Sequence, residues 1–432
     1  MSKFQIILLA VFIVLAVIGV FIFATSTSNS SAQLVPVTIW GTLPATDVRT
    51  AIDDIEAANK DTFSATYTYV DEADFQSKLV NAIATGQGPD LILIPQDIFL
   101  SVKSLLFPIP YANYSQRLFQ DSFAQAGEVF LAPEGIYALP AAIDPLVMFW
   151  NRDILSTAGL ALPPSTWTNV VNDVPALTKK DANGNIVQSA VSFGEWTNVP
   201  HAKNILSMLM LQSGTPIVSA DPTTGKLVSA LLSQSSSGIS PAQEALSFFT
   251  QFADPSKSIY SWNRAKSSAD SAFLAGTLAF YFAPASETPI IRARNPNLNF
   301  DVAEVPQTGT TGQATYADVY AFGLLKSSPH LATDVIDANL LTSDTAVSDI
   351  AAAAAVAPSR RDLLAQTQSQ AYQAVFWQSA LIGDNFLDPS PSSTDTIFDM
   401  MVESVTSGSK SAEGSLRTAD GSLAALLRQV AQ

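Results

Sequence analysis

The pattern of hydrophobic and polar positions predicts alternating strands and helices in the first hundred residues. Residues 37–40 (VTIW), 62–70 (TFSATYTYV) and 91–94 (LILI) are rich in β-branched, aromatic and aliphatic side chains and predict strands. Residues 47–59 and 71–86 carry apolar side chains at helical intervals. The uninterrupted apolar run of 91–94 is typical of a strand covered on both faces. This alternation predicts an α/β fold with a mostly parallel sheet.

The rest of the chain continues with strands and a larger helical share. Residues 146–150 (LVMFW) predict another buried strand, and residues 181–187, which contain Asn-Gly, predict a hairpin tip. Residues 201–283 predict a long, mainly helical middle. Residues 300–305 and 319–325 predict two further strands. The last hundred residues are predicted to be mainly helical.

Residues 4–24 form the most apolar segment of the chain. These 21 residues contain Gln5 as the only strongly polar side chain, and as a helix they would span about 31 Å, close to the ~30 Å hydrocarbon core of a bilayer. Lys3 precedes the segment and the next basic residue is Arg49, so the positive-inside rule places everything after the segment outside the cytoplasm. We expect a transmembrane anchor over residues 1–24 and a flexible Ser/Thr-rich tether over residues 25–36.

Two other interpretations of the N-terminal segment stay open. It could be a cleaved signal peptide, since the small residues 30–32 (SSA) offer a cleavage site before Gln33, although a signal-peptide core is usually shorter. It could also be a buried core helix. If the segment is a transmembrane anchor, the remaining chain is exported and tethered to the cell membrane. If it is a signal peptide, the remaining chain is released as a secreted or periplasmic protein.

Composition excludes several kinds of chemistry. Among 432 residues there is no cysteine and there are 2 histidines, so disulfides, thiol nucleophiles, zinc-thiolate sites and a lipid-modified cysteine are impossible, and a histidine-based metal site has almost no material. The net charge of −16 disfavours a nucleic-acid partner. We therefore expect no metal and no cofactor.

Local motifs for catalysis or phosphate binding are not convincing. Residues 86–89 (GQGP) follow a predicted helix and precede a strand, the reverse of a phosphate-binding loop. Residues 181–185 resemble the start of a calcium loop but lack its glycine and its glutamate. A pair of carboxylates for glycoside cleavage stays open as an alternative, because with 38 Asp and Glu residues spacing alone selects none.

Several ordered segments together resemble the carbohydrate-binding group of extracellular solute-binding proteins that serve ABC importers, the maltose-binding-protein type. They extend in the family's order from about residue 37 to residue 365. No single segment is diagnostic, and the ordered set carries the resemblance. The segments are residues 78–94 (KLVNAIATGQGPDLILI), 139–184 (beginning LPAAIDPLVMFWNRD), 271–282 (SAFLAGTLAFYF), 302–309 (VAEVPQTG) and 356–364 (VAPSRRDLL).

The resemblance implies a periplasmic-binding-protein-like fold of the class II type. In that fold two α/β lobes are joined by a hinge, the chain passes between them three times, and the ligand lies in the cleft. Transferred to this sequence, the crossings fall near Ile143, near Ala321 and around residues 359–364. The predicted division gives residues 33–143 plus 322–360 to lobe 1, and residues 144–321 plus 361–432 to lobe 2.

The resemblance also implies which loops face the ligand. Carboxylates and amides would bond sugar hydroxyls, while aromatic rings would stack on the apolar faces of sugar rings. Two of these carboxylates have plain alternatives: Asp144 could serve the hinge or cap a helix, and Glu195 could be a solvated loop residue. The candidate ligand-binding residues are Trp40, Thr42, Gln96, Asp97, Asp144, Glu195, Trp196, Ser286, Glu287, Tyr316 and Asp395.

The sequence departs from the family pattern in three places. The lipid-attachment cysteine is missing, and the hydrophobic N-terminus would replace it. Residues 283–287 (APASE) stand where the family often has Gly-Trp, and Asp395 and Thr396 stand where a late aromatic is common. A classical maltodextrin specificity is therefore not expected.

The resemblance implies a monomeric, non-enzymatic receptor that hands a sugar or oligosaccharide to an ABC permease. Three alternatives stay open. The same fold could bind a polyamine, for which Asp97, Asp144 and Glu195 are suited. It could bind an iron complex or a phosphorylated polyol, although the candidate loops offer no Arg or Lys for a phosphate. A surface glycosidase acting through two carboxylates is the third.

Overall fold

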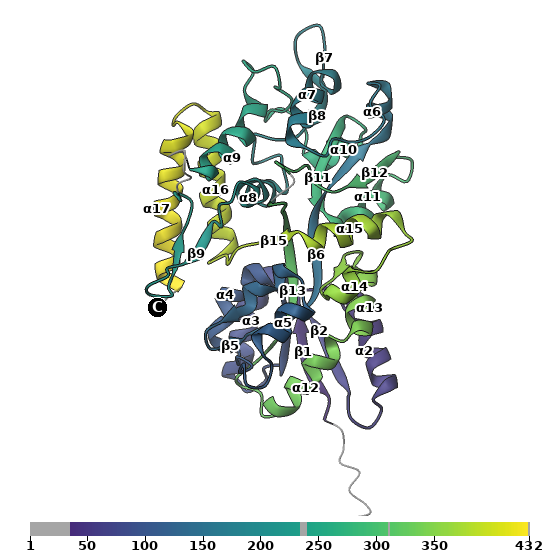
Figure 1. Cartoon of the computed structure of the whole chain (residues 1–432), viewed down its shortest axis with the longest axis vertical. Coiled ribbons are helices and arrows are strands. Elements are labelled where there is room, and N and C mark those ends of the chain that lie inside the picture. The colour runs from purple at the N-terminus through teal and green to yellow at the C-terminus, as the bar shows by residue number, and fades with distance from the viewer. Residues whose placement is uncertain (1–34, 234–239, 310–311, 431–432) are drawn as a thin grey trace, which may run out of the picture.

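The computed structural model describes residues 35–233, 240–309 and 312–430, and shows two groups of elements joined by long strands (Figure 1). The predicted N-terminal transmembrane segment and most of the tether lie outside these residues. Within the described part of the chain, no helix has both the length and the apolar character needed to cross a membrane.

The first group is built on a five-stranded portion of the main sheet, in the order β2-β1-β3-β13-β6. The strand β1 pairs in parallel with β2 and β3, whereas β13 is antiparallel to both β3 and β6. This confirms the α/β class with a parallel first portion. The bounds are β1 Val37–Gly41, α2 Ala45–Ala58, β2 Ala65–Tyr69, α3 Glu72–Ala84, β3 Leu91–Pro95, α4 Phe99–Val102, α5 Gln116–Ser122, β4 Leu131–Ala132, β5 Gly135–Ile136, α12 Leu331–Leu341 and α13 Asp344–Ala354.

Local sequence explains these elements well. The Asp71 carboxylate accepts a hydrogen bond from the Ala73 amide at 3.0 Å and caps α3, whose residues Phe75 and Leu79 are buried. Gly86 follows α3 with φ +70°, the left-handed conformation that ends many helices. The strand β3 is buried along its whole length, as its continuous apolar run predicts.

The long strand β6 (Ala138–Asn151) connects the two groups of elements, since it runs from one to the other (Figure 1). All its residues are buried. Its first half pairs with β13 (Thr315–Leu324), and its second half pairs with β11 (Leu278–Pro284) and β12 (Phe300–Ala303). The sequence predicted a strand over residues 146–150 only, because Asp144 and Pro145 interrupt the apolar run; the structure extends it on both sides.

The second group packs helices around the far half of β6 and the strands β11, β8 and β7. The predicted hairpin tip at residues 181–187 is confirmed by the antiparallel pairing of β7 and β8. The bounds are α6 Arg152–Thr157, α7 Trp167–Leu177, β7 Lys179–Lys180, β8 Ile186–Val191, α8 Ala202–Gln212, β9 Val218–Ala220, β10 Leu227–Ser229, α9 Pro241–Thr250, α10 Ala269–Leu274, α11 Thr288–Arg294, α15 Ala371–Leu381, β15 Gly383–Asp384, α16 Pro391–Thr406 and α17 Ala412–Val430. The strand β14 (Ala357–Pro358) pairs with the first half of β6, and α14 (Arg361–Leu364) contacts α5, so these two elements lie with the first group.

Two sequence predictions differ from this arrangement. The middle of the chain is less helical than expected, because the hairpin of β9 and β10 and the strand β11 fall within residues 201–283. The strand β13 begins at Thr315 rather than at residue 319, because its first residues pair with both β15 and β6. The residue boundaries of the two lobes stay a prediction.

Candidate functional site

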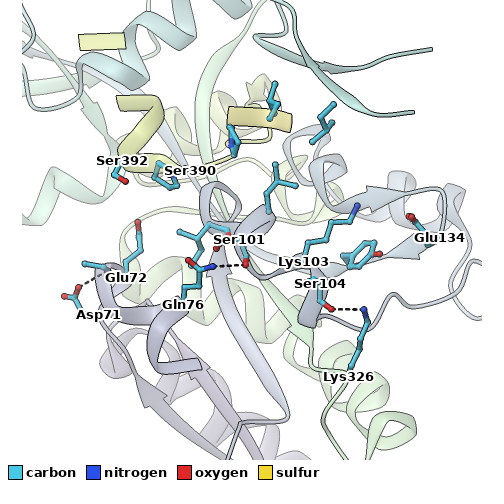
Figure 2. A pocket seen from close by; sticks show the side chains of 18 residues that line it. Asp71, Glu72, Gln76, Ser101, Lys103, Ser104, Glu134, Lys326, Ser390 and Ser392 are labelled. Carbon is cyan, nitrogen blue, oxygen red and sulfur yellow. Dashed lines mark hydrogen bonds between the residues drawn. The ribbon is translucent and has the colours of Figure 1, made fainter. Parts of the chain in front are cut away.

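An open groove of about 1360 Å³ separates the two groups of elements (Figure 2). One wall comes from the start of α3 and the segment 98–104. The other wall comes from residues 389–392 at the start of α16, together with Leu227 and Leu427. The walls carry serine hydroxyls, the amide of Gln76 and charged side chains, so the groove suits a polar ligand.

Five carboxylates influence one another electrostatically, and we call them the acidic centre; of the five, Glu72 lines the groove. One is the first residue of α3, one follows β3, two lie on the crossing strands β6 and β13, and one precedes α16. Each influences the charge of at least one other, and the ammonium of Lys203 on α8 opposes several of them. The acidic centre consists of Glu72, Asp97, Asp144, Asp318 and Asp388.

Asp97 lies directly after β3, where the chain turns into a short 3₁₀ segment. The pKa of its carboxyl is raised to about 7, chiefly by burial and also by the negative charges of Asp318 and Asp388, while Lys203 opposes the rise. Its Oδ1 atom is shielded from solvent and has no hydrogen-bond partner among the described residues. An atom of this kind is ready to accept a hydrogen bond from a ligand.

Gln96 connects the end of β3 to the crossing strand β13. Its Nε2 atom donates to Asp318 Oδ1 at 2.9 Å and to the Tyr316 hydroxyl at 3.4 Å, and its Oε1 atom accepts from the Val319 amide at 2.6 Å. Burial raises the pKa of Asp318 to about 6, which the hydrogen bond from Gln96 opposes and the charge of Asp144 reinforces. Gln96 therefore holds Asp318 in place.

Asp144 sits in the middle of β6 and contacts the loop that follows β11. Its Oδ1 atom accepts a hydrogen bond from the Ser286 amide at 3.1 Å. Burial raises the pKa of its carboxyl to about 6, and the bonds from Ser286 oppose the rise. The neighbouring Glu287 accepts from the Tyr281 hydroxyl at 2.9 Å and lies 2.6 Å from His201 Nε2. These contacts bring Asp144, Ser286 and Glu287 together.

Trp40 and Thr42 lie at the carboxyl end of β1, next to β3. The Thr42 amide donates to the Leu93 carbonyl at 3.1 Å, while its Oγ1 atom is buried without a hydrogen-bond partner among the described residues. Both residues are half-buried. Ligands of open α/β sheets bind beyond the carboxyl ends of strands, and Thr42 and Asp97 follow the carboxyl ends of the neighbouring strands β1 and β3.

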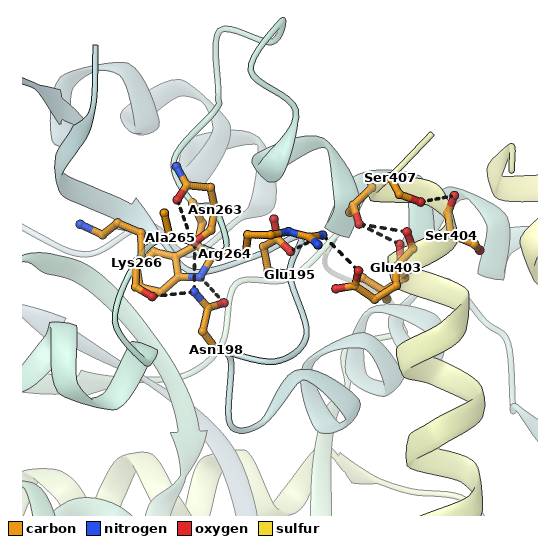
Figure 3. Close-up of polar contacts among 12 residues, drawn as sticks. Glu195, Asn198, Asn263, Arg264, Ala265, Lys266, Glu403, Ser404 and Ser407 are labelled. Carbon is orange, nitrogen blue, oxygen red and sulfur yellow. Dashed lines mark hydrogen bonds and ion pairs between the residues drawn. The ribbon is translucent and has the colours of Figure 1, made fainter. Parts of the chain in front are cut away.

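Three of the predicted residues lie apart from this assembly. Glu195 is buried beneath Arg264, which donates to Glu195 Oε2 at 3.3 Å and to Glu403 Oε2 at 3.1 Å (Figure 3). Trp196 is 8% exposed and packs in the hydrophobic core. Asp395 is exposed on α16. Ligand contacts of these three residues stay predictions.

Comparison with known proteins assigns the chain to a family. The family model described as bacterial extracellular solute-binding protein matches residues 50–377, which is more than half of the chain. The chain belongs to this family.

Relatives of this solute-binding protein are distant. A provisionally named binding protein of Brucella abortus (strain 2308) is 23% identical over 243 residues, and the match covers 55% of this chain and 54% of the relative. The chain thus spans about half the length of the curated relatives it matches.

Solved structures confirm the two-lobed α/β fold of the family. The cyclic α-maltosyl-1,6-maltose-binding protein of Arthrobacter globiformis matches with a TM-score of 0.75 and 16% identity, covering 92% of this chain and 100% of that one. A cyclo/maltodextrin-binding protein complexed with maltotetraose matches with a TM-score of 0.72 and 16% identity, covering 90% and 97%. At these identities the likeness establishes the fold alone.

Four polar residues of the solute-binding protein's site escaped the sequence prediction. Their contacts join residues that are far apart in the chain. The Lys203 ammonium binds the Asp388 carboxylate, which also accepts a hydrogen bond from the Thr394 hydroxyl at 2.7 Å. Asp318 could have been noticed, because it is a carboxylate within the mostly apolar strand β13. Local sequence carried no sign of the ion pairs. The missed residues are His201, Lys203, Asp318 and Asp388.

The side chains of the candidate site are charged and hydrogen-bonding groups. In the part of the chain that the structure describes, no group of three or more His, Asp or Glu side chains is arranged to hold a metal ion. The groups that face one another are carboxylates, an amide, hydroxyls and the Lys203 ammonium. They can accept and donate hydrogen bonds to a polar guest.

Proposed function

We propose that this solute-binding protein is the receptor of an ABC importer and captures a sugar or oligosaccharide between its two lobes. The observation that carries the proposal is the groove of about 1360 Å³ between the lobes of a member of the solute-binding family. Structural neighbours whose names include maltotetraose, mannotriose and cyclic maltosyl-maltose share its fold. Their ligands support the sugar class.

The proposed ligand contacts lie at the carboxyl ends of β1 and β3 and on the crossing strands. Thr42 Oγ1 and Asp97 Oδ1 are buried oxygen atoms without partners among the described residues. A buried polar atom left unpaired costs about 1–3 kcal/mol, which a ligand hydroxyl or amine would recover. The proposed contacts are Trp40, Thr42, Gln96, Asp97, Asp144, Ser286, Glu287 and Tyr316.

Capture works by closure of the lobes. A ligand shifts the molecule toward a closed state only when it binds that state more tightly, so it must contact both lobes. Asp97 comes from the first group, whereas Ser286 and Glu287 come from the second. The crossing strands β6 and β13 are the natural hinge, since they carry Asp144 and Asp318 through the site.

We further propose a location and partners for the protein. Residues 1–24 would tether a monomer to the outer face of the cell membrane, or be cleaved as a signal peptide. The closed form would be presented to the permease subunits of the importer. No bond is made or broken in the ligand.

Binding is tested with the full-length protein in detergent micelles against a panel of neutral mono- and oligosaccharides and amino sugars. We expect at least one sugar to raise the unfolding temperature. At 100 times its Kd it should add about 2.7 kcal/mol to the free energy of unfolding. A panel in which no sugar changes the stability would contradict the carbohydrate assignment.

The glycosidase alternative needs a separate measurement. After incubation with each oligosaccharide that binds, the solution is analysed for new reducing ends. The proposal predicts that the oligosaccharide is recovered intact. Hydrolysis that depends on the protein would move the assignment to the two-carboxylate class of enzyme.

A further inference from the structure

We propose that the second group of elements carries a separate sugar site, a small pocket that binds one neutral sugar ring. The pocket encloses about 240 Å³, and we call it the amide pocket because five carboxamide side chains line it. It shares no lining residue with the groove between the two groups, so its ligand would be additional to the one captured by closure. The five carboxamides are Asn151, Gln188, Asn295, Asn297 and Asn299.

Four segments of the chain meet at the amide pocket. Asn151 is the last residue of β6, and Gln188 lies on β8. Residues 274–276 end α10 and lead to β11, and residues 295–299 connect α11 to β12. The elements α6, β8 and α10 lie in the upper part of the second group (Figure 1). Because β6 pairs with β11 and β12, and β11 also pairs with β8, the sheet holds these segments in fixed positions.

The side chain of Asn151 is buried but only half used. It is 3% exposed, and its Oδ1 atom accepts hydrogen bonds from the amides of Asp153 and Ile154, both at 3.0 Å. Its Nδ2 atom donates to no group among the described residues. A Cβ atom added to Gly276 would have this Nδ2 atom as its one close neighbour, at 3.8 Å. The Asn151 amide nitrogen therefore faces open space above Gly276, where a ligand oxygen can accept from it.

The other carboxamides add acceptors and donors around this nitrogen. Gln188 Nε2 donates to the Leu177 carbonyl at 2.7 Å, which leaves the Gln188 Oε1 atom to accept from a ligand. Asn299 Nδ2 donates to Asp153 Oδ1 at 2.7 Å, so these two side chains fix each other. The exposed amide of Asn297 makes no hydrogen bond to the described residues. A hydroxyl group both donates and accepts, so the hydroxyls of a sugar match this mixture.

The charge of the amide pocket favours a neutral ligand. Its lining residues include no Lys, Arg or His, and Asp153 is the one carboxylate among them. An anionic ligand would therefore find no cation, and Ca²⁺, which takes six to eight oxygen ligands and favours carboxylates, would find a single one. The half-buried side chains of Leu274 and Leu298 can contact the C–H groups of a sugar ring. The volume is below the ~300–1,000 Å³ of pockets for drug-sized molecules, which suits one ring.

Two sources could supply such a ring. It could be a free monosaccharide, or it could be the terminal sugar of a glycan on a surface. The two differ at the anomeric carbon, because a glycan terminus has a glycosidic oxygen there and a free sugar has a hydroxyl. A methyl glycoside imitates the glycan terminus, so comparing each sugar with its methyl glycoside separates the sources.

Binding is measured by ligand-observed NMR with the full-length protein in detergent micelles. The probes are glucose, galactose, mannose and N-acetylglucosamine, each also as its methyl glycoside. We expect at least one of them to bind and to slow amide hydrogen exchange in residues 151–157 and 295–299. Binding of none of these sugars overturns the proposal.

Hydrogen exchange also separates this site from the proposed function. A sugar that slows exchange in residues 151–157 and 295–299 but not in the groove segment 98–104 supports the amide pocket and leaves the groove without a ligand. A sugar that slows exchange at both places supports both sites. Slower exchange at residues 98–104 alone supports the groove and overturns the amide pocket.

Two variants test the amide pocket by different routes. Asn151→Ser removes the free Nδ2 atom, while serine caps helices about as well as asparagine, so α6 keeps its cap. Gly276→Asn leaves the cap untouched and fills the space beside Asn151, and asparagine tolerates the φ of +71° at this position. We expect each variant to weaken sugar binding at the amide pocket about fivefold or more.

The matched control is Asn183→Ser, which removes an exposed carboxamide at the tip of the hairpin of β7 and β8. Its affinity for the sugar should equal that of the unmodified protein. Thermal unfolding confirms that each variant is folded. Unchanged affinity in folded Asn151→Ser and Gly276→Asn would contradict the amide pocket.

Discussion

Asp144 and Asp318 stand directly opposite each other on the antiparallel strands β6 and β13. Residues that face each other across a strand pair share one face of the sheet, and like charges in such positions are destabilising. Both carboxyls have a pKa raised to about 6, chiefly by burial, and the charge of Asp144 adds to the rise at Asp318. The crossing strands β6 and β13 therefore carry a repulsion between two buried carboxyls.

The first prediction concerns this pair. Asp318→Asn keeps an oxygen that can accept from Gln96 but removes the charge, so it should raise the free energy of unfolding at pH 8 by about 1–3 kcal/mol. At pH 4 the wild-type carboxyl is protonated in the folded state, and the gain should largely disappear. Denaturant unfolding at both pH values measures the difference. A destabilised variant at pH 8 would contradict the repulsion.

The second prediction is the pH dependence of the unmodified protein. A carboxyl whose pKa is raised on folding binds its proton more tightly when folded, so stability falls as pH rises from the unfolded pKa through the folded one. Asp97, with a pKa of about 7, and Asp144 and Asp318, with pKa values of about 6, place this fall between about pH 4 and pH 7. Thermal unfolding should show a lower unfolding temperature at pH 7.5 than at pH 5. A rise over this interval would refute the assignment.

The third prediction concerns the ion pair of Lys203 and Asp388. Lys203→Met removes the cation and leaves a fully buried carboxylate with only its neutral donors, which should cost about 3–5 kcal/mol. The double variant Lys203→Met/Asp388→Asn removes both charges and should recover most of the loss. Urea unfolding of both single variants and the double variant completes the cycle. A simple sum of the two single effects would mean that the pair is not coupled.

The sequence predicted what depends on local pattern. The strands around Ile39 and Leu93 and the α3 helix followed from periodicity, whereas Gln96 and Asp97 were selected through the family resemblance. The family resemblance supplied the two-lobed fold, which the comparisons confirm.

Other features depend on contacts between distant segments. Lys203 and Asp388 are 185 residues apart, and Gln96 and Asp318 are 222 apart, so no local pattern could pair them. The strand β6 was underestimated because a carboxylate at position 144 is a poor strand residue in isolation. The Ser286 amide, far along the chain, satisfies it in the folded state.

The fourth prediction concerns Trp196, whose ring is 8% exposed within the core. Trp196→Ala should lower the free energy of unfolding by about 3–5 kcal/mol, because it leaves a cavity. Trp196→Phe keeps most of the buried area and should cost less. Denaturant unfolding of both variants measures the difference. A loss below 1 kcal/mol in Trp196→Ala would show that the ring is not a core element.

Closure of the lobes around a sugar is the central claim, and a distance between the lobes tests it most directly. Because the chain has no cysteine, Asn81→Cys on α3 and Thr396→Cys on α16 can be spin-labelled selectively on opposite sides of the groove. The distance is measured with and without a sugar that raises the unfolding temperature. The account predicts a shorter, narrower distance distribution with the sugar bound. An unchanged distribution at saturation would contradict it.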